Sequence, residues 1–104
     1  MIRKLKRVES IPYILLIHAD ESRMAIDKYM IYCEIYVVEL NKIVIAVYAL
    51  QVTNAKTVEI KNIAVSEEHQ GQGIGQMLLE DACIKTKEKG YRIFSTVRNL
   101  INSS

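Results

Sequence analysis

The most informative part of this sequence is Gln70-Gly71-Gln72-Gly73-Ile74-Gly75, which holds three of the four glycines in the chain. It follows a run rich in β-branched residues, 58–65, and precedes an amphipathic helical pattern over 74–89. Glycine allows positive φ and a close approach of ligand to backbone, and the start of a helix offers unpaired N–H groups to an anion. The stretch therefore predicts a binding site for a phosphorylated ligand.

The glycine spacing excludes the two commonest phosphate-binding loops. A dinucleotide-binding fingerprint has the form G-x-G-x-x-G, but Gln76 stands where the third glycine belongs after Gly71 and Gly73. A P-loop has the form G-x-x-x-x-G-K-[ST], and here Gln76 replaces its second glycine and is followed by Met77 and Leu78. The stretch therefore lacks both the lysine and the magnesium-binding hydroxyl of a P-loop.

A third pattern, Q/R-x-x-G-x-G/A, does fit, in the form Gln70-x-x-Gly73-x-Gly75. This pattern is the acetyl-coenzyme A (acetyl-CoA) pyrophosphate loop of the GNAT family of N-acetyltransferases. The strand, loop and helix start over 58–80 also resemble that family as one block. The chain is thus similar to a GNAT acetyltransferase.

Length and composition limit the other possibilities. The 104 residues allow one domain, 1–104, and 50% hydrophobic with 25% charged residues is an ordinary globular composition. A net charge of +2 with mixed signs does not indicate nucleic acid binding. No apolar run follows the N-terminal charges and no stretch reaches 18 apolar residues, so we expect neither a signal peptide nor a membrane span. The expected location is the cytoplasm.

Several polar residues were weighed as functional and interpreted as structural. The basic cluster Arg3, Lys4, Lys6 and Arg7 is typical of a strand with solvated charges, and contact with an acidic partner or with the adenosine 3′-phosphate is the alternative. Cys33 and Cys83 lack metal-ligand spacing, so they are interpreted as buried thiols and no metal site is predicted. His18 and His69 are interpreted as structural or solvent-facing residues. These residues therefore add no catalytic candidate.

The hydrophobic pattern predicts the following elements in order: a half-exposed strand over 2–8, a helix ending at 19, a second helix after 20, strands over 34–40, 43–52 and 57–65, the helix over 74–89, and a last strand over 91–97. Ser10 is the expected N-cap of the first helix and Asp20 that of the second. The second helix is expected to bury one face, made of Ile26, Tyr29, Met30 and Cys33.

The connections between these elements predict the fold class. The two-residue break Asn41-Lys42 suits a tight antiparallel hairpin, and a turn over 53–56 leads to the next strand. Gly90 is expected to end the long helix, so that the last strand returns parallel to 57–65 as a right-handed βαβ unit. We expect an α+β fold with a mixed sheet, in which antiparallel strands are followed by a parallel βαβ unit, as in GNAT proteins.

The resemblance implies how acetyl-CoA is held. In this family the strand before the loop and the strand after the helix splay apart, and the pantetheine arm enters the gap. Backbone groups of Ile63, Ala64 and Val65 are then expected to pair with the arm. The loop is expected to bind the pyrophosphate, and its implied cofactor-binding residues are Gln70, which helps to close the loop, Gly71, Gln72, Gly73, Ile74, Gly75 and Gln76.

The resemblance also implies the chemistry, which is direct transfer of acetyl from the thioester to a primary amine of a small molecule or peptide. Glu59 is the candidate catalytic base, because the family often places a carboxylate on this strand near the cleft. The alternative for Glu59 is a charge at a solvent-facing strand position. A backbone N–H near Val65 is the expected donor to the oxyanion.

The sequence departs from the family pattern at its C-terminal end. The family continues past the last predicted strand with an asparagine, a helix bearing a tyrosine general acid, and a final strand. Asn102 stands about where that asparagine belongs and is taken as a cofactor-binding residue, with Asn99 as its rival. We therefore expect the fold to lack the usual last helix and strand, and with them the general acid and part of the acceptor wall.

Three functions remain open at this stage. The first is an N-acetyltransferase using acetyl-CoA as co-substrate without a metal. The second is a catalytically weak or inactive acetyl-CoA binder that acts as a sensor or subunit, and the third is an interaction module with an unused glycine loop. The last strand, with Ile93, Phe94 and Val97 on an unpaired edge, further predicts a homodimer.

Overall fold

The computed structural model describes residues 2–19 and 22–95. Its elements are, in order, β1 (Ile2–Lys4), α1 (Tyr13–Ala19), α2 (Arg23–Met30), β2 (Cys33–Leu40), β3 (Ile43–Asn54), β4 (Thr57–Val65), the 3₁₀ turn η1 (Glu67–His69), α3 (Ile74–Glu88) and β5 (Arg92–Ser95). The predicted α+β class and the order of its elements are confirmed.

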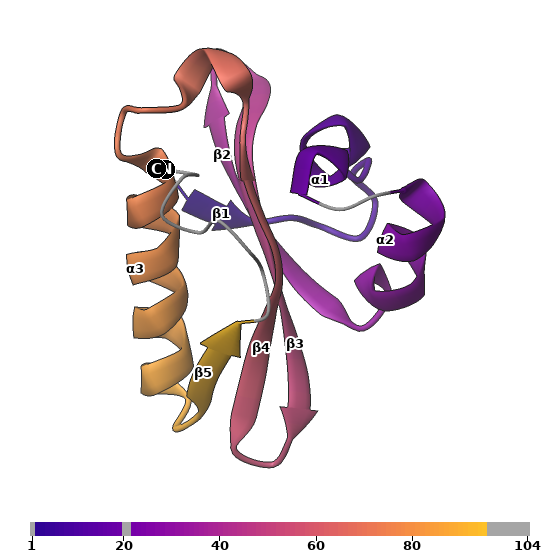
Figure 1. The fold of residues 1–104 in the computed structure, drawn as a ribbon. Coiled ribbons are helices and arrows are strands. Elements are labelled where there is room, and N and C mark those ends of the chain that lie inside the picture. The colour runs from indigo at the N-terminus through magenta and orange to yellow at the C-terminus, as the bar shows by residue number, and fades with distance from the viewer. Residues whose placement is uncertain (1, 20–21, 96–104) are drawn as a thin grey trace.

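The strands form one mixed sheet in the order β1-β2-β3-β4-β5. The first four are antiparallel neighbours, and β5 is parallel to β4. Helix α3 covers one face of the sheet, and α1 with α2 covers the other (Figure 1). This three-layer arrangement follows from the βαβ unit, because the crossover helix of a parallel strand pair packs on one face only.

Each face of the sheet has its own apolar core. On the α3 side, Leu78 and Ala82 of the helix pack with strand residues such as Tyr48 and Ile63. On the other side, Leu16 of α1 and Ile26 of α2 pack with a second set of strand residues. Strand side chains alternate between the two faces, which lets β2, β3 and β4 serve both cores. The sheet is therefore a central layer that is buried on both faces.

Two predicted turns occur as the sequence indicates. Asn41 and Lys42 both have positive φ, 52° and 68°, and join β2 to β3 as a tight two-residue hairpin. Gly90, with φ of 78°, follows the last residues of α3 and lets the chain turn back into β5. Both turns depend on local backbone preference, which is why sequence reasoning located them.

The predicted strand over 2–8 is too long, because β1 ends at Lys4. Glu9 closes a turn after it: its backbone N–H donates to the Lys6 carbonyl at 3.0 Å, and its carboxylate accepts the Lys6 backbone N–H at 2.6 Å. Val8 lies in this turn and is 93% exposed. The alternation of basic and apolar residues in the sequence therefore extends past the strand, because the residues after Lys4 form a turn and do not pair with a neighbouring strand.

The expected helix caps also need correction. Helix α1 begins at Tyr13, directly after Pro12, so Ser10 is not its N-cap. Helix α2 is capped by Ser22, whose Oγ accepts the Ala25 backbone N–H at 3.1 Å, in place of Asp20. Cys33, predicted on the buried face of that helix, is the first residue of β2. Neighbouring residues with similar capping ability made these boundaries ambiguous in the sequence.

Candidate functional site

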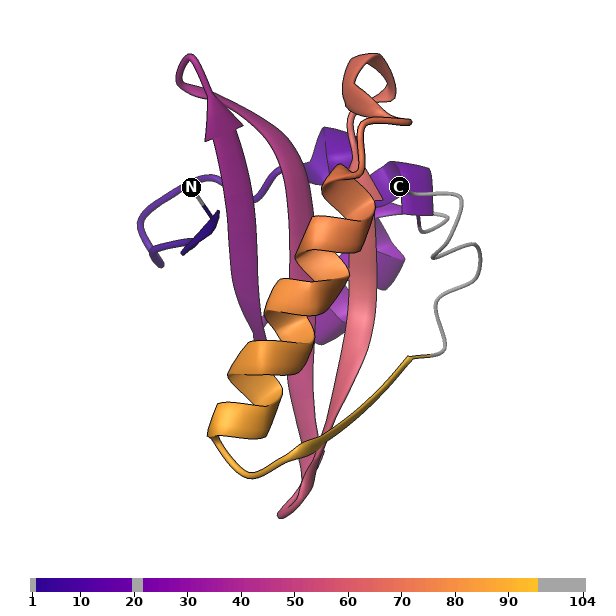
Figure 2. The same ribbon diagram turned by 90° about the vertical axis from the view of Figure 1, so that its left-hand side faces the viewer.

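The first feature of the site is the short pairing between β4 and β5. Their parallel register runs from Thr57 opposite Arg92 to Ile60 opposite Ser95, and within the described residues it goes no further. In Figure 2, β5 lies beside the lower half of β4 only. The second half of β4, which includes the predicted cofactor contacts Ile63, Ala64 and Val65, pairs with β3 on its other side. Within the described residues, the other edge of this half-strand therefore has no paired strand.

A bulge in β4 marks the start of this half-strand. Ile60 lies opposite Leu50 and Asn62 lies opposite Ala49, so Lys61 is the extra residue. Such a bulge bends its strand and redirects side chains. In the part of the chain that the structure describes, the bulge coincides with the end of the β4–β5 pairing.

Asn62, in the bulge, is a residue that the sequence analysis did not single out. Its side chain is buried, and its Nδ2 donates to the Leu16 carbonyl at 3.1 Å and to the Tyr29 hydroxyl at 2.9 Å. It thereby links the strand to both α1 and α2. An asparagine inside an otherwise apolar strand was the available signal, because a buried amide must find hydrogen-bond partners.

The loop after β4 is closed by the side chain of Gln70. Its Nε2 donates to the Val65 backbone carbonyl at 3.0 Å, joining the two ends of the loop. Within the same segment, Ser66 Oγ and His69 Nδ1 lie 2.7 Å apart. His69 is thus held in the 3₁₀ turn by a hydrogen bond to Ser66, which agrees with its interpretation as a structural residue.

Gly73 is the N-cap of α3 and has a left-handed conformation, with φ of 81°. No side chain caps this helix, although the Gly73 carbonyl accepts the Met77 backbone N–H at 3.0 Å. A Cβ built on Gly73 meets no atom within 4 Å, so the space beside its backbone is open. The N–H groups of the first helical turn therefore face a position that suits an anion in size and charge.

Glu59 is not a solvent-facing residue, because it is only 9% exposed. Val58 and Ile60, its neighbours along β4, belong to the α3 side of the sheet, so the Glu59 side chain lies on the side of α1 and α2. Its Oε1 is 3.7 Å from Lys61 Nζ. Glu59 thus lies one residue before the end of the β4–β5 pairing, and its role as a base remains a prediction.

The Cys33 thiol lies close enough to Glu59 and Lys61 for their charges to affect its pKa. Burial raises the pKa of Cys33 to about 12; the charge of Lys61 lowers this pKa and the charge of Glu59 raises it. Cys33 therefore stays protonated at neutral pH. The prediction of two buried thiols needs correction, because Cys33 is only half-buried and Cys83, on the outer face of α3, is exposed.

Asn102 and its rival Asn99 lie outside the described residues. Among residues 2–19 and 22–95, no three His, Cys, Asp or Glu side chains gather in a way that suits a metal ion. No helix in the same part of the chain is long and apolar enough to cross a membrane. The described site therefore consists of the half-strand Ile63 to Val65, the loop closed by Gln70, and the start of α3.

A half-strand with one edge unpaired among the described residues, continued by a glycine loop at a helix N-terminus, is an arrangement that suits an extended ligand with a phosphate group. The chain belongs to the GNAT acetyltransferases, because the model of the acetyltransferase (GNAT) domain matches residues 32–103. The resemblance recognised in the glycine loop is thus confirmed.

Similar proteins agree with this assignment. The uncharacterized N-acetyltransferase YvbK of Bacillus subtilis (strain 168) is 41% identical over 78 residues, which are 75% of this chain and 50% of that protein. A GNAT family acetyltransferase from Elizabethkingia anophelis, solved with acetyl-CoA bound, is 41% identical with a TM-score of 0.87, covering 91% of this chain and 63% of that one. A Bacillus subtilis acetyltransferase solved in complex with CoA is 36% identical with a TM-score of 0.81, covering 90% and 62%. The chain therefore spans between about half and two thirds of the length of these relatives.

Proposed function

We propose that this chain binds acetyl-CoA and transfers its acetyl group to a primary amine of a small molecule or peptide. The observation that carries the proposal is the left-handed Gly73 at the start of α3, with open space beside its backbone and a strand edge leading to it. Relatives at 36% and 41% identity hold CoA and acetyl-CoA, which supports the same ligand here.

In this proposal, successive parts of acetyl-CoA contact successive segments of the chain. The pantetheine arm lies along the free edge of Ile63, Ala64 and Val65 and takes hydrogen bonds from their backbone. The pyrophosphate lies on the N–H groups from Gly71 to Gln76, where each charge-assisted bond contributes on the order of 1.5 to 3 kcal/mol. Gln70 keeps the loop closed through its bond to the Val65 carbonyl.

The chemistry requires a neutral amine. Glu59 accepts the proton of the ammonium group, directly or through water, and a backbone N–H near Val65 stabilises the negative charge on the carbonyl oxygen. The amine nitrogen bonds to the carbonyl carbon, and the negative charge that forms on the oxygen returns as the carbon–sulfur bond breaks, so that CoA leaves with the electron pair on sulfur. The proton that the nitrogen loses as the amide forms passes to this sulfur, directly or through water, which gives the free thiol. No covalent intermediate with the protein is needed.

Thermal unfolding with and without acetyl-CoA tests the binding step. Acetyl-CoA at 100 times its Kd is expected to stabilise the folded chain by about 2.7 kcal/mol. S-acetylpantetheine, which lacks the pyrophosphate, is the matched ligand and is expected to bind much more weakly. An unchanged unfolding temperature at saturating acetyl-CoA contradicts the proposal and favours an interaction module.

Release of CoA thiol with a panel of primary amines then tests transfer. Turnover above the rate without amine supports the N-acetyltransferase. Binding without turnover supports the alternative, a weak or inactive acetyl-CoA-binding sensor or subunit.

We further propose that two copies associate through β5, and that the protein is located in the cytoplasm. Strand β5 is at the edge of the described sheet, and its Phe94 is 43% exposed. An edge strand with an exposed aromatic residue readily pairs with a second chain.

A further inference from the structure

A second cavity lies on the α3 face of the sheet, at the end opposite the glycine loop. It is open to solvent on one side, has a volume of about 210 Å³, and is lined by the last turns of α3, by the start of β2 and by the parts of β3 and β4 next to the turn that joins them. Thr86 of α3 lines it and lies 13 residues after Gly73, about 20 Å along the helix. This cavity is therefore separate from the proposed acetyl-CoA site.

The interior of the cavity is apolar and aromatic. Leu50, Val52 and Val58 line it from the strands, and Tyr36 and Tyr91 add aromatic rings. Sites for small molecules have this composition, with a few polar groups that orient the ligand. An apolar cavity of about 150 Å³ is enough to hold one benzene ring. The space therefore suits a single substituted ring.

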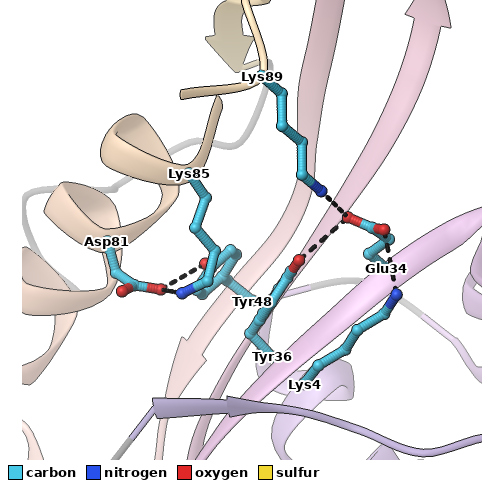
Figure 3. A network of polar contacts seen from close by, with 7 residues as sticks. All are labelled: Lys4, Glu34, Tyr36, Tyr48, Asp81, Lys85 and Lys89. Carbon is cyan, nitrogen blue, oxygen red and sulfur yellow. Dashed lines mark hydrogen bonds and ion pairs between the residues drawn. The ribbon is translucent and has the colours of Figure 1, made fainter. Parts of the chain in front are cut away.

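The polar groups around the cavity form a network with excess positive charge (Figure 3). Glu34 accepts hydrogen bonds from Lys4 at 3.1 Å, from the Tyr36 hydroxyl at 3.0 Å and from Lys89 at 3.3 Å. Burial raises the pKa of the Glu34 carboxyl, but these three hydrogen bonds together outweigh burial and hold the pKa below its usual value. Glu34 is therefore an ionised carboxylate with three hydrogen-bond donors, of which Lys89 has the longest contact.

Lys89 is the cation that a ligand can recruit. Lys85, the other lysine that lines the cavity, is held by Asp81 and lies 4.7 Å from the centre of the Tyr36 ring. Lys89 has an exposed side chain, and its contact with Glu34 is longer than those of Lys4 and Tyr36 with the same carboxylate. If Lys89 turns away, Glu34 still has Lys4 and Tyr36 as partners. An anionic group in the cavity thus gains a lysine without leaving Glu34 unpaired.

Thr86 is a buried polar residue at the helix side of the cavity. Its hydroxyl has no hydrogen-bond partner among the described residues, but the oxygen itself is shielded from the cavity. Lys89 is therefore the polar group that orients a ligand.

We propose that this cavity binds a small aromatic carboxylate, with the ring against Leu50, Val52 and Val58 and the carboxylate on Lys89. This inference goes beyond the proposed acetyl transfer and does not depend on it. A single ring with one carboxylate is small, so the expected Kd for benzoate is about 1 mM.

Titration of the isotope-labelled chain with benzoate, followed by amide NMR shifts, tests the site. We expect saturable shifts at Val52, Val58, Thr86 and Lys89, and none over 71–76. Benzamide, which has the same ring without the charge, is expected to bind at least about fivefold more weakly. No saturable shift at the cavity residues overturns the proposal, as does a response confined to 71–76.

Two variants test separately how the lysine charge and the space for the ring contribute to benzoate binding. Lys89→Gln is expected to weaken benzoate binding about fivefold, whereas Lys87→Gln, an exposed lysine in the same turn that does not line the cavity, leaves it unchanged. Val52→Trp fills the cavity from a half-exposed position and is expected to abolish binding while the fold is kept. Equal affinities in wild type and Lys89→Gln, or unchanged binding in a folded Val52→Trp, overturn the proposal.

Discussion

At the scale of single residues, the proposed function depends on a glycine backbone and a buried carboxylate. Gly73 places the first turn of α3 beside open space, and Glu59 lies one residue before the end of the described β4–β5 pairing. Gly73 is proposed to serve acetyl-CoA binding, and Glu59 is proposed to serve turnover. Substitutions at the two positions are therefore expected to change different measured quantities.

Gly73→Ala is expected to weaken acetyl-CoA binding at least tenfold. The new methyl group enters the space where the pyrophosphate meets the backbone, and the left-handed φ of 81° costs an L-residue about 1–2 kcal/mol of stability. Gly90→Ala is the matched control, because Gly90 has a similar φ of 78° and equally open surroundings. Calorimetric titration is expected to show weaker binding for Gly73→Ala alone, with similar stability losses for both variants. Equal affinities in the two variants contradict the loop assignment.

Glu59→Gln is expected to reduce turnover by roughly 10² to 10⁴ at neutral pH and to leave the Kd for acetyl-CoA unchanged. The amide keeps the size of the side chain but cannot accept the ammonium proton. Glu68→Gln, in the exposed 3₁₀ turn, is the control and is expected to keep wild-type turnover. Steady-state rates from pH 6 to 9 provide the measurement. If Glu59→Gln has wild-type rates across this range, Glu59 is not the base, and another group or water takes this role.

At the scale of elements, polar side chains fix the helices on the two faces of the sheet. Asn62 links the bulge of β4 to α1 and α2, and the Tyr48 hydroxyl donates to Asp81 of α3 at 2.6 Å. Each link joins residues that are distant in the sequence. These hydrogen bonds add to the apolar packing that holds the helices on the sheet.

Asn62→Ala is expected to lower the free energy of unfolding by about 2 kcal/mol, because two buried hydrogen bonds are lost together with packed atoms. Tyr29→Phe removes only one acceptor for Asn62 and is expected to cost about 1 kcal/mol. Urea unfolding of the three proteins gives these differences. A loss for Asn62→Ala no greater than that for Tyr29→Phe would show that the bond to Leu16 contributes nothing.

Tyr36 is expected to make stability fall in alkaline solution. Burial, and then the neighbouring Glu34, raise the pKa of Tyr36 to about 12 in the folded chain, whereas an unfolded tyrosine has a pKa of about 10. A raised folded pKa means that this contribution is complete below pH 10 and is lost as the pH rises towards 12. Tyr36→Phe is expected to flatten the stability profile between pH 10 and 12 relative to wild type. The exposed control Tyr32→Phe is expected to follow the wild-type profile, and an identical slope in all three proteins contradicts the assignment.

At the scale of the whole molecule, three layers place the two proposed sites at opposite ends of one helix. The glycine loop lies at the start of α3, and the aromatic cavity lies against its last turns. The sheet between the layers ends, within the described residues, at β5. Its outer edge is the surface proposed for pairing with a second copy.

Light scattering after size exclusion at micromolar concentration tests this pairing. The expected mass is twice the 11.9 kDa of one chain, since two paired edge strands with their side chains readily bury a standard interface of about 1,600 Å². Phe94→Glu places a charge on the edge and is expected to give single chains. A mass near 11.9 kDa for the wild type contradicts the homodimer.

Features set by neighbouring residues could be predicted from the sequence. The glycine loop, the hairpin at Asn41 and Lys42, and the end of α3 before Gly90 depend on backbone preferences and on hydrogen bonds within a few residues. The choice of Ser22 over Asp20 as N-cap was missed even though it is local, because both residues cap helices well.

Features that depend on distant residues became visible only in the folded chain. The burial of Glu59, the links from Asn62 to Leu16 and Tyr29, and the end of the β4–β5 register each require strands and helices to meet. The cavity under α3 likewise brings Glu34 and Lys89, 55 positions apart, within 3.3 Å. Local preference carries no information about such contacts, because packing of the apolar faces determines which segments come together.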